Sequence, residues 1–175
     1  MRFKNRYLCF QLTAEQRHRR DSNVAGGLVV AEHVTAAAVA QAVRIAVAEE
    51  FGDFGTGLSM ATHAITCCYR NVYFAQNSQV KYFSPLTGVG ILRVPRDLAR
   101  EVWAAIVLLS ELHSMNLNCR ISVFHIAGTI KHAQISTIRH DKCILITMRS
   151  RLRLDDSKLE LLIKKSASAI NAVES

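Results

Sequence analysis

The spacing of apolar residues along the chain predicts strands and helices in alternation. In the opening stretch, MRFKNRYLCFQL, every second residue lies on one side of a predicted strand over 1–12. That side carries three cations and then three apolar residues: Arg2, Lys4, Arg6, Leu8, Phe10 and Leu12. After a polar loop, the spacing becomes helical over about 32–51, where valines recur at four-residue steps and Gly52 is a natural end. The chain therefore begins with a basic strand start, followed by an alanine-rich helix.

The stretch QVKYFSPLTGVGILRVPR predicts a hairpin, because two strand-like runs, 79–83 and 89–94, are joined by a turn that contains Pro and Gly. Asp97 is placed to cap a second helix with one apolar stripe. The stripe consists of Leu98, Val102, Ala105, Ile106, Leu109 and Leu112. Trp103 is also interpreted as core, and His125, in the next apolar strand CRISVFHIAG, as a half-buried residue.

The last third of the chain predicts further helices. The hydroxyl of Thr129 is placed to cap a short basic helix that starts near Ile130. The run CILIT that follows is either a fifth strand or part of that helix, since periodicity does not decide at this length. A terminal helix is expected to open at Asp155, Asp156 and Ser157.

The order strand, helix, strand, strand, helix, strand predicts an α+β fold, an RRM-like or ferredoxin-like βαββαβ sandwich with additional C-terminal helices. We expect a four-stranded antiparallel sheet with two helices on one face, and the added helices over an edge or over the other face. We assign residues 1–150 to this domain and 151–175 to a C-terminal helix or tail. The stretch at about 60–77 has no clean period and is interpreted either as an inserted loop or partner-binding element, or as a segment that another version of this chain lacks.

The net charge of +8 and the pI near 9.6 permit binding to a polyanion. The surplus is local. Residues 1–20 and residues 128–153 each hold six Lys or Arg against a single acidic residue. Such a distribution is typical of a nucleic-acid footprint.

The five cysteines are odd in number and irregularly spaced, which favours small core residues in a reducing compartment over a disulfide framework. Neither a secretory leader nor an apolar run of membrane-spanning length is visible in the sequence. We therefore expect a soluble, intracellular protein without a membrane partner.

Five blocks of the sequence together resemble a known family. They are RFKNRYL, FGDFG, QVKYFSPLTGVGILRVPRD, Trp103 in the following helix, and HIAGTIK. In this order they resemble the RNase P and RNase MRP protein subunits of the Pop-five type, over most of residues 1–12 and 50–139. The stretch at about 60–77 is an insertion relative to that family.

The resemblance implies a non-catalytic subunit of a ribonucleoprotein, located in the nucleus and nucleolus. The implied chemistry, removal of the 5′ leader from precursor tRNA, belongs to the RNA and its Mg²⁺, and no cofactor is expected on the protein. In RNase MRP a related particle acts on ribosomal RNA precursors. The implied partners are the RNase P/MRP RNA, a TIM-barrel-like protein subunit, a smaller related subunit and, indirectly, precursor tRNA.

Cations at these positions suit phosphate contacts, because guanidinium and ammonium groups neutralise backbone charge and release counterions. Together with the resemblance, this gives the RNA-binding candidates Arg2, Lys4, Arg6, Lys81, Arg93, Thr129, Lys131 and Arg139. Taken alone, a charged strand end is more often merely solvated, and the Gly128–Thr129 corner is either an ordinary helix cap, a phosphate site, or both. We expect folding to bring the strand start and this corner together on one surface.

The sequence also bears on two other classes of function. The central strand VGILRVPR lacks the exposed aromatics on which an RRM stacks bases, so we expect RNA binding through shape and phosphate. The alternative is a protein–protein adaptor with no RNA role, which would use its sheet edge or the stretch at about 60–77. A small enzyme is disfavoured. The glycines of GDFGTG match no phosphate loop, the seven histidines have no metal-ligand spacing, and no catalytic residue or metal site is predicted.

Overall fold

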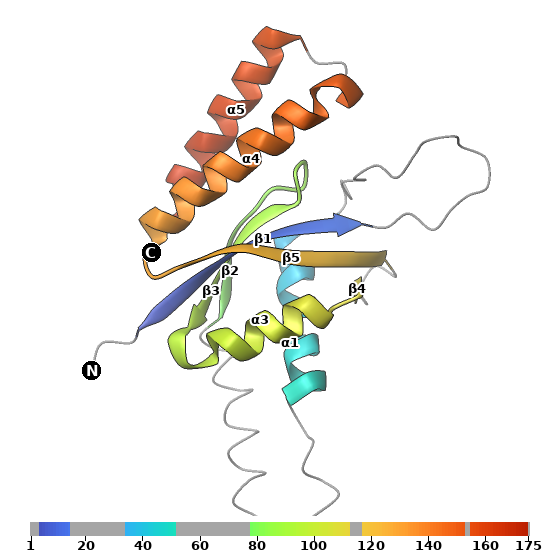
Figure 1. The fold of residues 1–175 in the computed structure, drawn as a ribbon, viewed down its shortest axis with the longest axis vertical. Coiled ribbons are helices and arrows are strands. Elements are labelled where there is room, and N and C mark those ends of the chain that lie inside the picture. The colour runs from blue at the N-terminus through green and yellow to red at the C-terminus, as the bar shows by residue number, and fades with distance from the viewer. Residues whose placement is uncertain (1–3, 15–33, 52–77, 113–116, 153–154, 175) are drawn as a thin grey trace, which may run out of the picture.

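The computed structural model describes residues 4–14, 34–51, 78–112, 117–152 and 155–174. These residues form an antiparallel five-stranded sheet with helices on both faces (Figure 1). The strands are β1 (Asn5–Ala14), β2 (Gln79–Phe83), β3 (Val89–Pro95), β4 (Glu111–Leu112) and β5 (Leu117–Ala127), in the sheet order β2-β3-β1-β5-β4. The predicted α+β class, with an antiparallel sheet, is confirmed.

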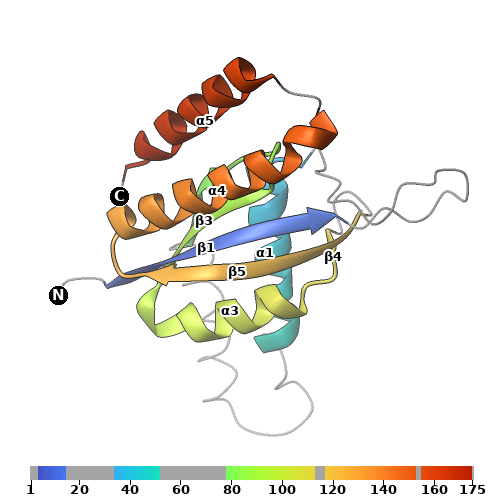
Figure 2. The same ribbon diagram turned by 45° about the horizontal axis from the view of Figure 1, so that its top comes forward.

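One face of the sheet is covered by α1 (Ala36–Phe51) and α3 (Ala99–Leu108) (Figure 2). The apolar side of β1 predicted from the two-residue period packs here against the valines of α1 and the predicted stripe of α3. The fully buried members include Leu8, Phe10, Val39, Val43, Val102 and Ile106. A residue type that repeats every two or four positions can remain buried along its whole element, which is why these local patterns predicted the core correctly.

The other face is covered by α4 (Ile130–Leu152) and α5 (Asp156–Asn171), which resolves the choice between an edge and a face. Tyr7, Cys9 and Ile91 from the sheet are buried there against Ala133 of α4 and Ile170 of α5. Because α4 is one continuous helix, CILIT is helical and is not a fifth strand, and the expectation of a short helix was wrong. α4 also crosses residue 150, although the division of the chain there stays a prediction.

Several predicted details are corrected. α1 begins at Ala36 and not at residue 32. Thr35 precedes it, and the Oγ1 of Thr35 accepts a hydrogen bond from the amide of Ala38 at 3.2 Å. Asp97 does not cap α3, because it lies inside a 3-10 turn, η1 (Arg96–Leu98), and the N-cap position of α3 is Leu98. The second helix also ends earlier than its stripe suggested, since Leu109 is extended and Leu112 belongs to the added strand β4.

Trp103 and Cys143, interpreted as core, and His125, interpreted as half-buried, are all exposed. Trp103 follows the buried Val102 but points away from the sheet, while Cys143 lies on the outer side of α4. Cys9 and Cys119 are buried, as expected. The stretch at 60–77 and residues Cys67 and Cys68 lie outside the described residues.

The hairpin turn is tied to β1 at one glycine. Gly88 has φ +70°, its amide donates to the carbonyl oxygen of Ser84 at 2.8 Å, and its own carbonyl accepts from the amide of Leu12 at 2.8 Å. A Cβ at this position would lie 2.2 Å from the carbonyl oxygen of Leu12. The backbone conformation and the close approach both require glycine here.

Of the helices that the structure describes, none is long and apolar enough to span a bilayer.

Candidate nucleic-acid interface

The first residues of β1 lie beside the last residues of β5, where α4 begins (Figure 1). Tyr7 pairs with Ala127, so Arg6 is placed next to the Gly128–Thr129 corner. The Arg6 side chain reaches that corner, because a Cβ built on Gly128 would lie 3.5 Å from Nη1 of Arg6. Nη1 also donates to the carbonyl oxygen of Asn5 at 3.3 Å. Folding therefore brings the predicted strand start and the predicted corner together.

The start of β1 is also joined to the end of β3. The amide of Arg96 donates to the carbonyl oxygen of Lys4 at 2.9 Å, and both side chains are exposed. Arg93 is half-buried. In the amide orientation that satisfies both groups, Asn5 Oδ1 accepts from Nε and Nη2 of Arg93 at 3.1 and 2.8 Å. This forked contact fixes the guanidinium of Arg93 at the same end of the sheet.

The N-terminus of α4 completes this end. Thr129 is the predicted cap, since its Oγ1 accepts from the amide of His132 at 3.4 Å. Lys131 is exposed in the first turn, and this turn contains no acidic residue. A helix N-terminus carries a partial positive charge and unpaired amide groups, so it adds to the field of the nearby cations.

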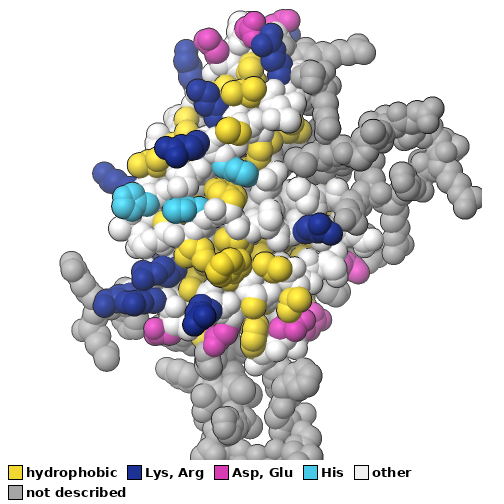
Figure 3. Space-filling view, viewed as in Figure 1, with side chains coloured by type: hydrophobic (Ala, Val, Ile, Leu, Met, Phe, Trp, Pro, Cys, Tyr) yellow, Lys and Arg dark blue, Asp and Glu magenta, His cyan; other side chains and the backbone are white. Residues whose placement is uncertain are grey.

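We call the group Lys4, Arg6, Arg93, Arg96 and Lys131 the basic end. Figure 3 shows Lys and Arg side chains gathered on the side of the molecule where β1 starts and continuing upward over the C-terminal helices. Asp97 is an exposed acidic residue in the turn that follows β3, so the positive field of the basic end is not uniform. The five cations nevertheless come from three parts of the chain that are far apart in the sequence: residues 4–6 at the start of β1, residues 93–96 where β3 passes into η1, and the first turn of α4.

Some predicted residues are not part of this group. Lys81 is half-buried on the edge strand β2, with β3 between it and β1. Arg139 is exposed on α4, but it lies eight residues beyond Lys131, or about 12 Å at the rise of an α-helix. Arg2 lies outside the described residues. Arg96, by contrast, was missed, although it directly follows β3 and the pairing of Asn5 with Pro95 places it beside Lys4.

The sheet face that carries Tyr7, Cys9 and Ile91 is covered by α4 in the part of the chain that the structure describes. Burial raises the pKa of the Cys9 thiol, with a smaller opposing effect from Thr137. Burial also raises the pKa of Tyr82 on the same face, and the Ser166 hydroxyl opposes that shift in part. Both shifts reflect a poorly solvated layer between the sheet and the C-terminal helices, which is not a place for a polyanion.

Comparison with known proteins identifies the family. The family model described as Rpp14/Pop5 family matches residues 6–138. The chain is 36% identical over 143 residues to "Ribonuclease P/MRP protein subunit POP5" of Schizosaccharomyces pombe, covering 81% of this chain and 88% of that protein. It is 26% identical to "Probable ribonuclease P/MRP protein subunit POP5" of Arabidopsis thaliana, covering 80% and 78%. For the Danio rerio protein of the same subunit name, identity is 25% and coverage 92% and 82%.

The matched range runs from β1 into the first half of α4 and contains Arg6, Arg93, Arg96 and Lys131 of the basic end. The resemblance inferred from five sequence blocks is thereby confirmed. With most of its length matched by the family model and a relative 36% identical over most of both chains, this protein belongs to the Rpp14/Pop5 family.

Proposed function

We propose that this chain is a non-catalytic protein subunit of a ribonuclease P/MRP ribonucleoprotein and that its basic end binds the RNA of that particle. The single observation that carries the RNA-binding part is the position of Arg6 against Gly128, which joins the start of β1 to the N-terminus of α4. The names of the relatives support the assignment to the particle.

The basic end suits the backbone of a folded RNA. Arg6 and Arg93 are held by contacts to Asn5, so less side-chain freedom is lost when a phosphate binds. Lys4 and Lys131 are exposed and supply point charges. Since α4 covers the sheet face, recognition of shape and phosphate is favoured over base stacking. In this proposal the phosphodiester chemistry belongs to the RNA and its Mg²⁺, and the protein has no cofactor.

We further propose that the fold is a ferredoxin-like, RRM-like βαββαβ sandwich with the short strand β4 and two helices added. The order β2-β3-β1-β5 of the longer strands supports this, as do the crossover helices α1 and α3 on one face. A TIM-barrel-like subunit and a smaller related subunit are the proposed protein partners. A nuclear particle, with a nucleolar share, is the proposed location.

The test is purification of the tagged full chain from its source cells at moderate salt, followed by sequencing of the bound RNA. One abundant, structured non-coding RNA that cleaves precursor tRNA or ribosomal RNA precursors is the expected result. The double substitution Arg6→Ala with Lys131→Ala should lower the recovered RNA several-fold, because two charges of the basic end are lost.

The charge-matched control for Arg6→Ala and for Lys131→Ala, each made singly, is Lys158→Ala. Lys158 is an exposed lysine at the start of α5, at the end of the helix pair away from Thr129 (Figure 1). Its removal changes net charge by one without touching the basic end. Recovery of stable protein partners with no enriched RNA would overturn the RNA-binding proposal in favour of a protein–protein adaptor.

A further inference from the structure

The outer side of α3 is apolar although it is exposed. Trp103 is 43% exposed, Val107 56% and Leu108 59%, all within two turns of one helix. The opposite side of α3 supplies Val102 and Ile106 to the core, so the outer residues are not needed to attach this helix. Grouped exposed apolar side chains on a soluble protein mark a contact surface more often than scattered ones do. We call these three residues the α3 face.

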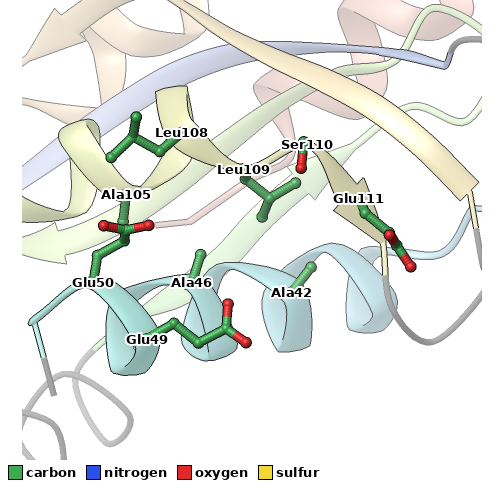
Figure 4. Close-up of a pocket in the computed structure, with 9 residues that line it drawn as sticks. All are labelled: Ala42, Ala46, Glu49, Glu50, Ala105, Leu108, Leu109, Ser110 and Glu111. Atoms are coloured by element: carbon green, nitrogen blue, oxygen red, sulfur yellow. The ribbon is translucent and has the colours of Figure 1, made fainter. Parts of the chain in front are cut away.

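Two hollows flank the C-terminal end of the α3 face. One, of about 220 Å³, lies between α3 and α1, where Ala42 and Ala46 face Leu109 (Figure 4). The other, of about 390 Å³, lies between α3 and β5. Leu108, Leu109 and Ser110 line both. Leu108 therefore lies between two hollows, which could receive side chains from a second element packed along α3.

The charges around the α3 face differ from those of the basic end. On the α1 side the rim carries Glu49, Glu50 and Glu111. Arg120 lies on the β5 side, and the exposed Arg100 lies one turn before Trp103 on α3. Figure 3 shows acidic side chains beside hydrophobic ones along the lower edge of the molecule. Three carboxylates at this rim would repel a phosphate backbone. They would also repel one another if two copies of this chain met through the same face in a two-fold dimer.

We propose that the α3 face binds an amphipathic helix of a different protein. Its apolar side chains pack on Trp103, Val107 and Leu108, and its Lys or Arg side chains lie beside Glu49, Glu50 and Glu111. The ridge of Trp103 and Val107, spaced four residues apart, fits the groove of a second helix. This inference is independent of the basic end and goes beyond the RNA-binding assignment.

The first experiment places the photo-cross-linker p-benzoyl-phenylalanine at position 107 of the tagged full chain in its source cells. After irradiation and purification, the expected product joins this position to one protein segment with apolar residues at helical spacing and flanking Lys or Arg. The same cross-linker at position 135 is the control, because Ile135 on α4 is equally exposed, at 57%. Cross-links to RNA, to a second copy, to residues 52–77 of the same chain, or to nothing would each overturn the proposal.

The second experiment measures binding of the cross-linked segment, as a synthetic peptide, to the purified full chain. Trp103 is the only tryptophan of the protein, so its emission should shift to shorter wavelength when a helix covers it. The pair Val107→Gln and Leu108→Gln should weaken binding about tenfold or more. The matched pair Ile135→Gln and Ile146→Gln, exposed residues of α4, should leave it unchanged. Equal loss in both pairs would contradict a site at α3.

The third experiment tests the charge pattern. Glu49→Lys with Glu50→Lys should weaken peptide binding about tenfold or more, and a peptide with its flanking cations changed to Glu should regain affinity for this variant. Affinity that does not respond to the swap would overturn the assigned orientation. RNA recovery with the unsubstituted chain tests the basic end separately from the α3 face. If no RNA were recovered, peptide binding at the α3 face would still stand, and if the peptide did not bind, RNA binding at the basic end would still stand.

Discussion

The side-chain amide of Gln134, buried in α4, donates to the carbonyl oxygen of Ile170 at 3.0 Å, where α5 ends. The same nitrogen lies 2.9 Å from the carbonyl oxygen of Val173. The last carbonyls of a helix lack the usual amide donor four residues on. The Ile170 carbonyl accepts from the Val173 amide at 3.3 Å, and Gln134 adds a second donor there. The contact fixes the C-terminal end of α5 to the first turns of α4, next to the basic end.

Gln134→Ala should therefore lower the free energy of unfolding by about 1 kcal/mol, because it removes the hydrogen bonds from Nε2 to the carbonyl oxygens of Ile170 and Val173. Urea titration of the full chain measures the change. Gln79→Ala, at an exposed position of β2, is the control and should change stability by less than about 0.5 kcal/mol. Equal midpoints for the two variants would show that the amide of Gln134 does not hold α5.

A second prediction concerns Asp141, a buried carboxylate of α4 that joins three parts of the fold. Oδ1 accepts from the hydroxyl of Thr87 and Oδ2 from the hydroxyl of Ser166, each at 2.5 Å. Thr87 lies in the hairpin turn and Ser166 in α5. Asp141→Ala should cost about 2 to 4 kcal/mol, because it unpairs two hydroxyls and leaves space behind.

The size-matched variant Asp141→Asn keeps an oxygen acceptor and should cost less than Asp141→Ala. Amide hydrogen exchange gives a local readout. The amides of α5 and of the hairpin turn should both lose protection in Asp141→Ala, whereas those of α1 should keep it. Loss of protection in α5 alone would contradict the role of Thr87 in this network.

A third prediction compares two glycines. Gly88→Ala should destabilise the chain by more than about 2 kcal/mol, because φ is +70° and the new Cβ would lie 2.2 Å from the Leu12 carbonyl oxygen. Gly128→Ala should be tolerated, since its nearest neighbour is the flexible Arg6 side chain at 3.5 Å. Thermal unfolding of both variants measures the difference. A Gly88→Ala protein as stable as Gly128→Ala would show that the turn adapts.

A fourth prediction concerns pH. His140 stacks on Phe124, with ring centroids 4.0 Å apart, and its Nε2 lies 2.8 Å from Gln11 Oε1. Burial lowers the pKa of His140 below its ordinary 6.5, and nearby Asp141 offsets that only in part. At acidic pH the unfolded chain then binds more protons than the folded chain. The contribution of neutral His140 to the free energy of unfolding is therefore complete above pH 6.5 and is lost as the pH falls through the lowered pKa.

The free energy of unfolding is measured at pH 7.5 and at pH 5.5. Its decrease between these two values should be larger for the unsubstituted chain than for His140→Gln. His132→Gln, at an exposed histidine in the first turn of α4, serves as the control and should keep the full pH dependence. Should all three proteins respond alike, the pH dependence has another source than the stacked ring.

The sequence predicted the elements whose buried side repeats regularly, and the structure shows why others were missed. Val39, Val43 and Val47 lie on one line of α1, and Leu8, Phe10 and Leu12 on one side of β1. CILIT, residues 143–147, is too short to show a period. In the structure it is part of α4, and Ile144, Leu145 and the following Met148 are buried on the inner side of that helix. Trp103 was assigned to the core from its residue type, although it lies off the stripe of buried residues.

The candidate site was predictable only in part, because it is assembled by long-range pairing. The charge pattern identified Arg6 and Lys131, and the family resemblance connected them. Arg96 lies beside Lys4 because of the register between β1 and β3. This register cannot be read from the spacing of residues within either strand. For the same reason Lys81 and Arg139 were included by type and sequence position, whereas the sheet order and the length of α4 separate them from the others.

The last prediction tests the basic end by its salt dependence. Each phosphate neutralised by a cation releases counterions, so the slope of log affinity against log salt should fall by about 0.7 to 0.9 for each lost contact. Arg6→Ala and Lys131→Ala should each remove one such contact from binding of the purified chain to its particle RNA, and the double variant about two. Lys158→Ala, at the far end of α5, should leave the slope unchanged even though the net charge falls equally. If every single variant lowered the slope alike, net charge and not this surface would determine affinity. A slope unaffected by Arg6→Ala would remove the contact at Gly128 from the interface, since that contact is what places its guanidinium beside α4.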